Sequence, residues 1–518
     1  MPYLPLQPSP FATDLPGEDH VLPEPRQVRD VIWSPAPPEP PPAPVLLDWS
    51  GPLADSLGLA EPDAETIAQL GGRLDPGAPM PWAARYGGHQ FGTWAGQLGD
   101  GRATVIGALR DVAGTMQDLQ LKGAGRTPYS RHADGRAVLR SSIREHLCSE
   151  AMAALGVPTT RSLALVATGE PVIRDMFYDG HPRHEPGAVV TRVAPSFVRF
   201  GHFQILAAHQ ETEQLEALVN HVLNRLYPGL GAPGREGWTA LFHEVCRRTA
   251  AMVVRWMHLG FVHGVMNTDN MSILGLTIDY GPFGWLSAYD PAFTPNTTDF
   301  AGRRYCYARQ PLIAGWNLAR LAEALLPLGL DLKELEAGLE AYQRSYADLD
   351  RAGMAAKLGL AVHRGAEDDA LIEAMWTMLE TSRADRTLFH RLLGRVDPHE
   401  AFRAESMDDA LPSEAEDKAR EALATWVARW QARVREDAWP TAERRAVMDR
   451  SNPILLPRNH LLLEVIRAAE GGDTRPLARL AEAMRDPWTE RGDIADLMAK
   501  PPRWADDTPG CATLSCSS

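Results

Sequence analysis

The spacing of apolar residues predicts strands in the first part of the chain and helices in the rest. Short apolar runs bounded by turn residues predict strands at 103–109, 119–122, 162–174 and 187–194. Apolar residues four apart predict a helix over 138–155, and helical periodicity returns at 211–226 and 237–259. Beyond about residue 312 we expect helices at 315–327, 333–349, 369–380, 414–436, 458–469 and 475–484. This order predicts an α+β fold.

The N-terminus departs from both periodic patterns because it is crowded with proline. Of the 42 prolines, 14 fall within the first 44 residues. Proline lacks the backbone N–H and fixes φ, so such a stretch is unsuited to helices and central strands. We therefore expect residues 1–44 to form an extended arm that wraps the body or is loosely ordered.

Composition and charge narrow the function classes. The chain has 518 residues with 52 Lys and Arg against 67 Asp and Glu, a net charge of −15. That balance argues against a nucleic-acid-binding protein, which needs clustered cations. No window is long and apolar enough for a membrane span, and no secretory signal is visible, so we expect a cytoplasmic protein. The five cysteines lack metal-ligand spacing.

The segment from His263 to Gly281 carries the most informative chemistry. It contains Asp269-Asn270 and then Asp279-Tyr280-Gly281, separated by two short apolar runs with a turn at Gly275. We expect a hairpin that places Asn270 and Asp279 at adjacent ends. Oxygen ligands of this kind, together with substrate phosphates, suit Mg²⁺. Protein kinases hold their metal with an Asn and an Asp in this order.

A kinase-like site also needs a phosphate-binding lysine paired with a glutamate. Lys122 ends a predicted strand, and Glu145 lies in the following helix, with Glu150 as the second candidate. Gly99 and Gly101 precede a strand and are suited either to a loop that covers a nucleotide or to a tight turn. These features predict a protein-kinase-like bilobal fold. Its parts would be the arm 1–44, an N-lobe-like part 45–200, a C-lobe-like part 201–311 and a helical extension 312–518.

One position departs from the kinase pattern. In sugar-kinase relatives an Asp stands two residues after the histidine, and here that position is Val265, which cannot accept a proton. The nearby carboxylate is Asp269. Three functions stay open: transfer of a nucleotide group, conventional phosphotransfer with a displaced base, and a pseudokinase regulator that only binds ATP. Val265 argues against the second, and the paired metal ligands argue against the third.

Several long blocks resemble the selenoprotein O family of protein adenylyltransferases. They are Tyr86–Gly92, Leu98–Ala103, Leu121–Arg131, Asp134–Ala137, Thr191–Ser196, Arg199–Gly201, His263–Asn270, Asp279–Pro282, Asn452–Pro453 and Pro457–His460. The resemblance spans most of the chain. It implies a kinase-like fold that transfers AMP from ATP to Ser, Thr or Tyr hydroxyls of protein substrates, with the ATP flipped relative to a kinase.

The resemblance also implies a role for each candidate residue. Asp269 would be the catalytic proton acceptor, and Asn270 and Asp279 would bind Mg²⁺, with Mn²⁺ as the alternative. The ATP contacts implied are Gly99, Gly101, Arg102, Lys122 with its partner Glu145, Asp134, Gly135, Arg192, Arg199 and Asp279. Arginine suits phosphate because its planar guanidinium presents several donors. We expect ATP and protein substrates as partners, no nucleic acid or membrane, and a monomer.

The C-terminus resembles the redox tail of the same family. Members end in selenocysteine or cysteine followed by two small residues, and here Cys516 holds that position. The resemblance implies a reversible disulfide, with Cys306 or Cys511 as the partner; an idle terminal thiol is the alternative.

Overall fold

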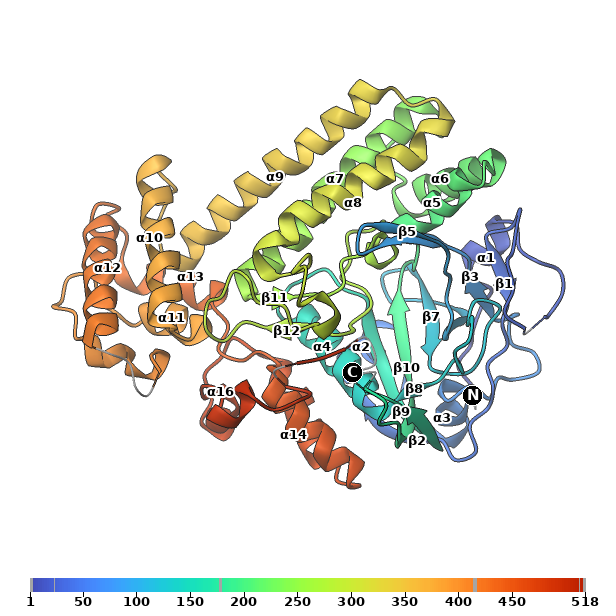
Figure 1. The fold of residues 1–518 in the computed structure, drawn as a ribbon, viewed down its shortest axis with the longest axis horizontal. Helices are drawn as coiled ribbons and strands as arrows, with labels where there is room; N and C mark the ends of the chain where they lie inside the picture. The colour runs from blue at the N-terminus through green and yellow to red at the C-terminus, as the bar shows by residue number, and fades with distance from the viewer. Residues whose placement is uncertain (1–2, 23, 177–178, 413–416, 512, 516–518) are drawn as a thin grey trace.

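The computed structural model describes residues 3–22, 24–176, 179–412, 417–511 and 513–515. Figure 1 shows a sheet-rich part that contains the N-terminus and a helical part that extends away from it. The structure is therefore a mixture of helices and antiparallel sheet, as the α+β prediction requires.

An antiparallel sheet forms the centre of the sheet-rich part. Its strands run in the order β1-β3-β6-β7-β10-β9-β2, and β8 pairs with β10 beside this path. The strand bounds are β1 Trp33–Pro35, β2 Val45–Trp49, β3 Trp82–Ala84, β6 Ala103–Arg110, β7 Met116–Lys122, β8 Ala137–Val138, β9 Arg161–Arg174 and β10 Arg183–Ala194. Two small sheets join β4 Gly87–Gln90 to β5 Thr93–Gln97, and β11 Phe261–Val262 to β12 Gly284–Trp285. All four strands predicted from the sequence are present.

The helices pack on the sheet and then on one another. Their bounds are α1 Pro10–Asp14, α2 Gly51–Ser56, α3 Ala64–Leu70, α4 Leu139–Ala154, α5 Phe200–Ala208, α6 Thr212–Leu226, α7 Arg235–Leu259, α8 Gln310–Leu325, α9 Leu332–Leu358, α10 Ala366–Ser382, α11 Arg386–Leu393, α12 Asp417–Arg435, α13 Thr441–Ser451, α14 Asn459–Glu470, α15 Arg475–Met484 and α16 Ala495–Met498. Short 3₁₀ turns lie at Thr268–Asn270, Thr297–Asp299, Tyr307–Arg309, Leu326–Leu328, Ala404–Ala410, Gly492–Ile494 and Arg503–Asp506.

The predicted helices are present, but several others were missed. The first residues of the predicted helix 414–436 lie outside the described residues, and α12 covers most of the rest. Sequence periodicity did not predict α5, α11 or α13. In α5 nearly every side chain is buried, so the helix has no polar face and no amphipathic pattern.

The proline-rich N-terminus contributes to the core rather than only passing over it. Phe11, in the short helix α1, stacks on Trp82 of β3 with ring centroids 4.7 Å apart. Pro35 ends β1 at the edge of the sheet. An edge strand tolerates proline because the missing N–H does not break a hydrogen bond of the sheet. The prediction of an extended arm did not include this helix or this strand.

Three large apolar clusters hold the body together. The largest joins one face of the sheet to α4–α8 and also includes α14 and α15, so the end of the chain returns to α4. A second cluster covers the other face of the sheet with α2 and α3. The third lies wholly within α9–α13 and their connections. In the part of the chain that is described, no helix is both long enough and apolar enough to cross a membrane.

Candidate active site

A cavity of about 660 Å³ lies between the sheet and the segment that follows α7. This volume is in the range of sites for small-molecule ligands and cofactors. Its walls come from the glycine-rich loop before β6, the end of β7, the loop before β8, and residues 265–282. Of the predicted site residues, Glu145 alone is not part of the lining.

The cavity is strongly basic although the whole chain is acidic. Eight cationic side chains line it: Arg102, Lys122, Arg126, Arg131, Arg136, Arg174, Arg192 and Arg199. Four carboxylates face them: Asp100, Asp134, Asp269 and Asp279. A surplus of positive charge in a hollow with protein walls attracts polyanions such as a triphosphate.

Lys122 is paired with Glu145, as the sequence predicted. Lys122 leaves the end of β7, and Glu145 approaches it from α4. Glu145 also accepts a hydrogen bond from Arg192 of β10. Burial, together with the charge of Arg192, lowers the pKa of Lys122 to about 8. The other candidate, Glu150, binds Arg161 at 2.7 Å instead.

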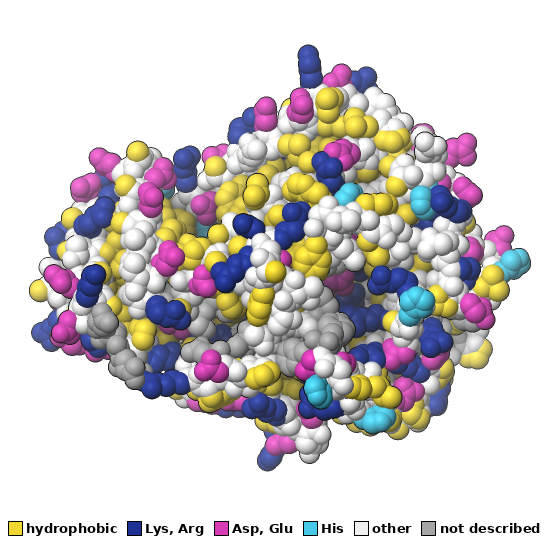
Figure 2. Space-filling view, viewed as in Figure 1, with side chains coloured by type: hydrophobic (Ala, Val, Ile, Leu, Met, Phe, Trp, Pro, Cys, Tyr) yellow, Lys and Arg dark blue, Asp and Glu magenta, His cyan; other side chains and the backbone are white. Residues whose placement is uncertain are grey.

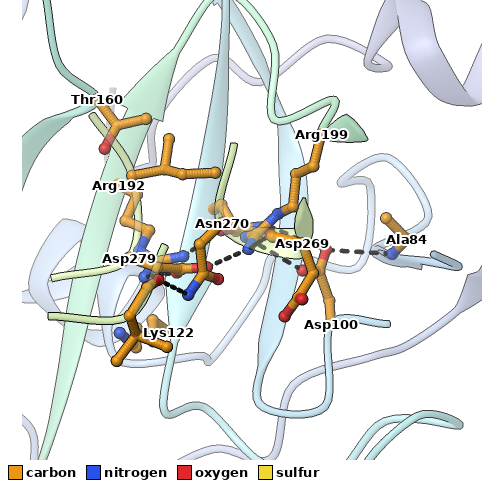
Figure 3. Close-up of polar contacts among 12 residues, drawn as sticks. Ala84, Asp100, Lys122, Thr160, Arg192, Arg199, Asp269, Asn270 and Asp279 are labelled. Atoms are coloured by element: carbon orange, nitrogen blue, oxygen red, sulfur yellow. Dashed lines mark hydrogen bonds and ion pairs between the residues drawn. The ribbon is translucent and has the colours of Figure 1, made fainter. Parts of the chain in front are cut away.

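Asp279 lies between two buried arginines (Figure 3). Arg192 donates to one carboxylate oxygen at 2.6 Å, and Arg199 pairs with the other. Although burial opposes ionisation, Arg199, Arg192 and Lys122 hold the pKa of Asp279 well below its usual range. Its backbone has a φ of 57°, a left-handed conformation that Asp tolerates better than most residues. Asp279 is therefore a fixed, ionised carboxylate.

Arg192 and Arg199 were expected to contact phosphate and would by default have been assigned to the surface. They are 4% and 3% exposed, and their guanidinium groups bind carboxylates of the site. Arg199 also approaches Asp100 at 3.7 Å and lies over the Tyr86 ring. Both arginines nevertheless line the cavity, so each faces the space a phosphate would enter.

Asp269 has the environment of a group that exchanges a proton near neutral pH. It is 6% exposed, and its Oδ1 has no hydrogen-bond partner among the described residues. Its Oδ2 accepts from the Gln90 side chain at 3.3 Å. Burial raises the pKa of Asp269 to about 6. Val265, at the position where the kinase sequence pattern has its base, lines the same cavity.

The predicted hairpin between Asn270 and Asp279 is wrong, although both residues reach the cavity. Ser272 bridges to Arg199 and Thr277 bridges to Thr159, so the two runs pair with different parts of the chain. The backbone groups of each run find hydrogen-bond partners elsewhere in the protein, so the two runs do not need to pair with each other. Gly275 still makes a turn, with its N–H bound to the Ser272 carbonyl at 3.1 Å.

The donor set in this region fits a hard cation. The Asn270 amide donates to the Val265 carbonyl at 2.9 Å, so its side-chain oxygen is available. Asp279 has further lone pairs beyond those used by the arginines, and the unpartnered Asp269 Oδ1 lies nearby in the same lining. Within the described residues no cluster of three His, Cys, Asp or Glu side chains forms a metal site by itself. Oxygen donors from few side chains suit Mg²⁺, which keeps waters and phosphate oxygens as ligands.

The glycine-rich loop and the loop before β8 need glycine for steric reasons. Gly99 has a φ of 101°, and a Cβ there would overlap the Tyr129 ring. Gly135 has a φ of 72°, and a Cβ there would overlap the Gly125 backbone. Asp134, beside it, is held by Arg174 through two hydrogen bonds of 2.7 Å. Gly101 and the exposed Arg102 continue the same wall of the cavity.

Sequence reasoning missed three side chains that shape the site. Asp100 is buried and accepts from the Ala84 N–H at 3.2 Å, facing Arg199. Gln90 contacts Asp269, and Arg174 holds Asp134. Asp100 and Gln90 lie inside blocks that matched the family pattern, and that match is the sequence signal that could have identified them. Arg174 ends a strand, and nothing in its sequence context indicates its partner.

The described end of the chain lies against the loop that follows Asp279. The Leu514 N–H donates to the Pro295 carbonyl at 2.9 Å, and the Thr297 N–H donates to the Leu514 carbonyl at 2.8 Å. Cys306 and Cys511 are both buried at 5% exposure. Cys516 lies outside the described residues, so its predicted disulfide stays a prediction.

A basic cavity with carboxylate and amide oxygens at one end is typical of enzymes that act on nucleotide phosphates. Comparison with known proteins agrees with that class. The family model for protein adenylyltransferase SelO matches residues 24–485. Three similar proteins carry the name protein nucleotidyltransferase YdiU. Those of Nitrosospira multiformis and Azoarcus sp. (strain BH72) are each 48% identical over 98% of this chain, covering 95% and 98% of their own lengths. That of Xanthomonas campestris pv. campestris (strain B100) is 50% identical over 97% of this chain and 98% of its own length. The chain belongs to the SelO family of protein adenylyltransferases, and it is a nucleotidyltransferase.

Proposed function

We propose that this enzyme transfers AMP from ATP to Ser, Thr or Tyr hydroxyls of protein substrates, in a kinase-like bilobal fold that holds ATP in the flipped orientation. One observation carries the proposal: Asp269 shares a single cavity with Lys122, Arg192, Arg199 and the pair Asn270 and Asp279, while the usual base position is Val265. A buried carboxylate with a pKa of about 6 is matched to proton transfer near neutral pH.

In the proposed reaction the acceptor oxygen attacks the α-phosphorus of ATP. Its proton goes to the Asp269 carboxylate, and the bond from the α-phosphorus to the bridging oxygen breaks, so pyrophosphate leaves with the electron pair. Lys122, Arg192 and Arg199 bind phosphate oxygens, and Glu145 holds Lys122 in place. Gly99, Gly101 and Arg102 form one wall of the ATP site, and Asp134 with Gly135 form another.

The proposed cofactor is Mg²⁺, with Mn²⁺ as the alternative, since both accept oxygen ligands. Asn270 and Asp279 would hold it, and it would neutralise negative charge on the phosphates. Because Arg192 and Arg199 already bind Asp279, they fix the orientation of its carboxylate before a nucleotide enters. That the enzyme acts as a cytoplasmic monomer without nucleic acid stays a prediction from the sequence.

Two labelled forms of ATP test the reaction. The protein is incubated with Mg²⁺ and ATP labelled at the α- or the γ-phosphate, and the label on protein is measured. We expect label from the α-position alone. Label from the γ-position alone would identify a conventional kinase and overturn the proposal, and label from neither would refute transfer to protein. Labelled UTP and GTP in parallel reactions show whether adenine is the preferred base.

A further inference from the structure

Two exposed apolar side chains, Phe91 and Leu312, lie among half-buried Trp94, Arg304 and Trp316 beside the Asp269 end of the cavity. We call this the hairpin surface and define it by Phe91, Trp94, Arg304, Leu312 and Trp316. Phe91 is 38% exposed and Leu312 is 71% exposed. Single exposed apolar residues are normal on protein surfaces, whereas a contiguous group marks a site of interaction. Figure 2 shows apolar side chains, with Lys and Arg among them, over the central part of the face of the molecule seen in Figure 1.

Ring contacts make the hairpin surface continuous. Arg304 lies 4.6 Å from the Trp316 ring centre, and a Cβ on Gly92 would lie 3.3 Å from its guanidinium carbon. Trp316 and Trp94 both contact His89, at 5.5 Å and 5.1 Å between ring centroids. Leu312 lies one helical turn before Trp316 on α8, so the two share a face. The surface thus joins the β4–β5 turn to the start of α8.

The other side of the same turn fixes the catalytic loop. The His89 N–H donates to Thr268 Oγ1 at 2.7 Å, and the Phe91 N–H donates to Asn267 Oδ1 at 3.2 Å. Between them, Gln90 donates to Asp269 and lines the cavity. A chain that delivers a hydroxyl to Asp269 at this end of the cavity therefore passes over the turn and its exposed Phe91.

The charge of the hairpin surface indicates what it binds. Among the described residues Arg304 forms no ion pair and lies over the Tyr305 and Trp316 rings, and the exposed Arg309 donates only to the carbonyls of Gly302 and Arg303. Arg320, which also lies over Trp316, is paired with Glu323 at 2.5 Å, so Arg304 is the cation of this surface that a ligand can pair with. Arginine and tryptophan are also the residues that most often dominate binding energy at interfaces. Positive charge beside an apolar face complements a segment that carries a carboxylate and an apolar side chain.

We propose that the hairpin surface binds the segment of the protein substrate that carries the acceptor hydroxyl, selecting an apolar side chain and a carboxylate next to it. This inference rests on the proposed function and names its substrate class. Leu312 and Phe91 supply the apolar contact, and Arg304 supplies the charge. The turn that binds the segment is the turn that holds Asp269, so binding places the hydroxyl near its base.

An array of synthetic peptides tests the proposal. Each peptide carries one Ser, Thr or Tyr, with Asp, Lys, Leu or Gly varied at the neighbouring positions, and transfer from α-labelled ATP is measured. We expect the wild-type enzyme to favour peptides with Asp and Leu near the acceptor. Arg304→Glu should shift the preference from Asp to Lys, and Leu312→Glu should lower kcat/KM for Leu-containing peptides about tenfold.

Matched controls separate binding of the segment from folding. Leu332→Glu replaces a leucine that is 59% exposed at the start of α9, and Arg450→Glu replaces an exposed arginine of α13. Both should keep the wild-type peptide profile. Because Leu312 is itself 71% exposed, Leu312→Glu leaves the core intact. The affinity of this variant for ATP, measured by calorimetry, should equal that of the wild-type enzyme.

Three outcomes would overturn the inference. Identical peptide profiles in wild type, Arg304→Glu and Leu312→Glu would do so, as would self-labelling of the enzyme without any labelled peptide. A dimer that Leu312→Glu converts to a monomer, with the profile unchanged, would assign the surface to contact between copies. Absence of any α-label in the wild-type reaction would instead refute the proposed function.

Discussion

The cavity and the helical module α10–α13 both bury charged side chains, but they balance charge differently. In the module, Arg433 binds Asp368 at 2.6 Å and Asp437 at 2.7 Å, and Arg364 binds Asp437 at 2.6 Å, so two arginines face two aspartates. In the cavity lining, eight cations face four aspartates. Lys122, Arg192 and Arg136 also pair with glutamates outside the lining, whereas Arg102, Arg126 and Arg131 form no ion pair with a described carboxylate. Removing ions from water costs several kcal/mol per ion unless they are paired. A cluster with unpaired positive charge therefore indicates a ligand that supplies the missing negative charge. A cluster in which the charges are paired indicates a structural role.

The two regions also differ in what holds them. The module packs with the end of α9 around one apolar cluster, in which Trp426 and Trp430 are almost wholly buried. Around the cavity, Lys122, Glu145 and Arg192 form a continuous polar network that extends through Asp279 to Arg199. Substitutions in the network should change catalysis most, and substitutions in the module should change stability most.

Asp279→Ala should have the largest effect on transfer. The variant loses a proposed metal ligand, and we expect transfer to fall by about 10²–10³-fold or more, measured with α-labelled ATP. It also removes the carboxylate that Arg192 and Arg199 share, while Arg192 keeps Glu145, so ATP affinity in the presence of a chelator should be kept or increased. Asp290→Ala, an exposed aspartate outside the cavity, is the control. Unchanged transfer by Asp279→Ala would refute the site.

Asp269→Asn should lower kcat by a factor on the order of 10² or more, because the amide cannot accept the hydroxyl proton. Its shape is almost that of the wild-type side chain, so KM for ATP should change little. A loss confined to KM would show that Asp269 binds the nucleotide rather than the proton. Steady-state kinetics at saturating peptide and varied ATP distinguish the two results.

The sequence predicted some elements of this structure and missed others. The strands of the sheet and the amphipathic helices such as α7 and α9 followed from periodicity, because one face of each is buried. The uniformly buried α5 and the short helix α1 gave no such signal. The hairpin between Asn270 and Asp279 was predicted from local pattern, and pairing of Ser272 and Thr277 with distant residues replaced it.

Within the site, the sequence located the cavity residues but not all of their partners. Lys122 and Glu145 were predicted as a pair because a kinase-like site needs a phosphate-binding lysine with a glutamate partner on the following helix. The contacts of Arg192 and Arg199 with Asp279 depend on how β10, α5 and the segment after α7 meet, and no spacing along the chain encodes that. Gln90 is 179 residues from Asp269, so its contact is likewise a property of the fold.

The pH dependence of kcat/KM should be a smaller effect than those of the variants above, and it tests the roles of Asp269 and Lys122. Burial raises the pKa of Asp269 to about 6, so its base form is lost as pH falls through about 6. Burial beside Arg192 lowers the pKa of Lys122 to about 8, so its cation is lost as pH rises through about 8. We expect a bell-shaped profile between these values, with each limb approaching a tenfold change per pH unit. An acid limb near pH 4 would contradict the role of Asp269.

Trp430→Ala should leave transfer almost unchanged while lowering stability. Trp430 is 0% exposed in the module, and its indole N–H donates to the Leu358 carbonyl at 2.8 Å. Its removal leaves a cavity and an unpaired carbonyl, so we expect a loss of about 3–5 kcal/mol in the free energy of unfolding. Denaturant unfolding measures this loss, and Trp504→Ala, at a side chain 37% exposed, should cost less. If Trp430→Ala abolished transfer at a temperature where the variant stays folded, the module would take part in catalysis, and the division between the two regions would fail.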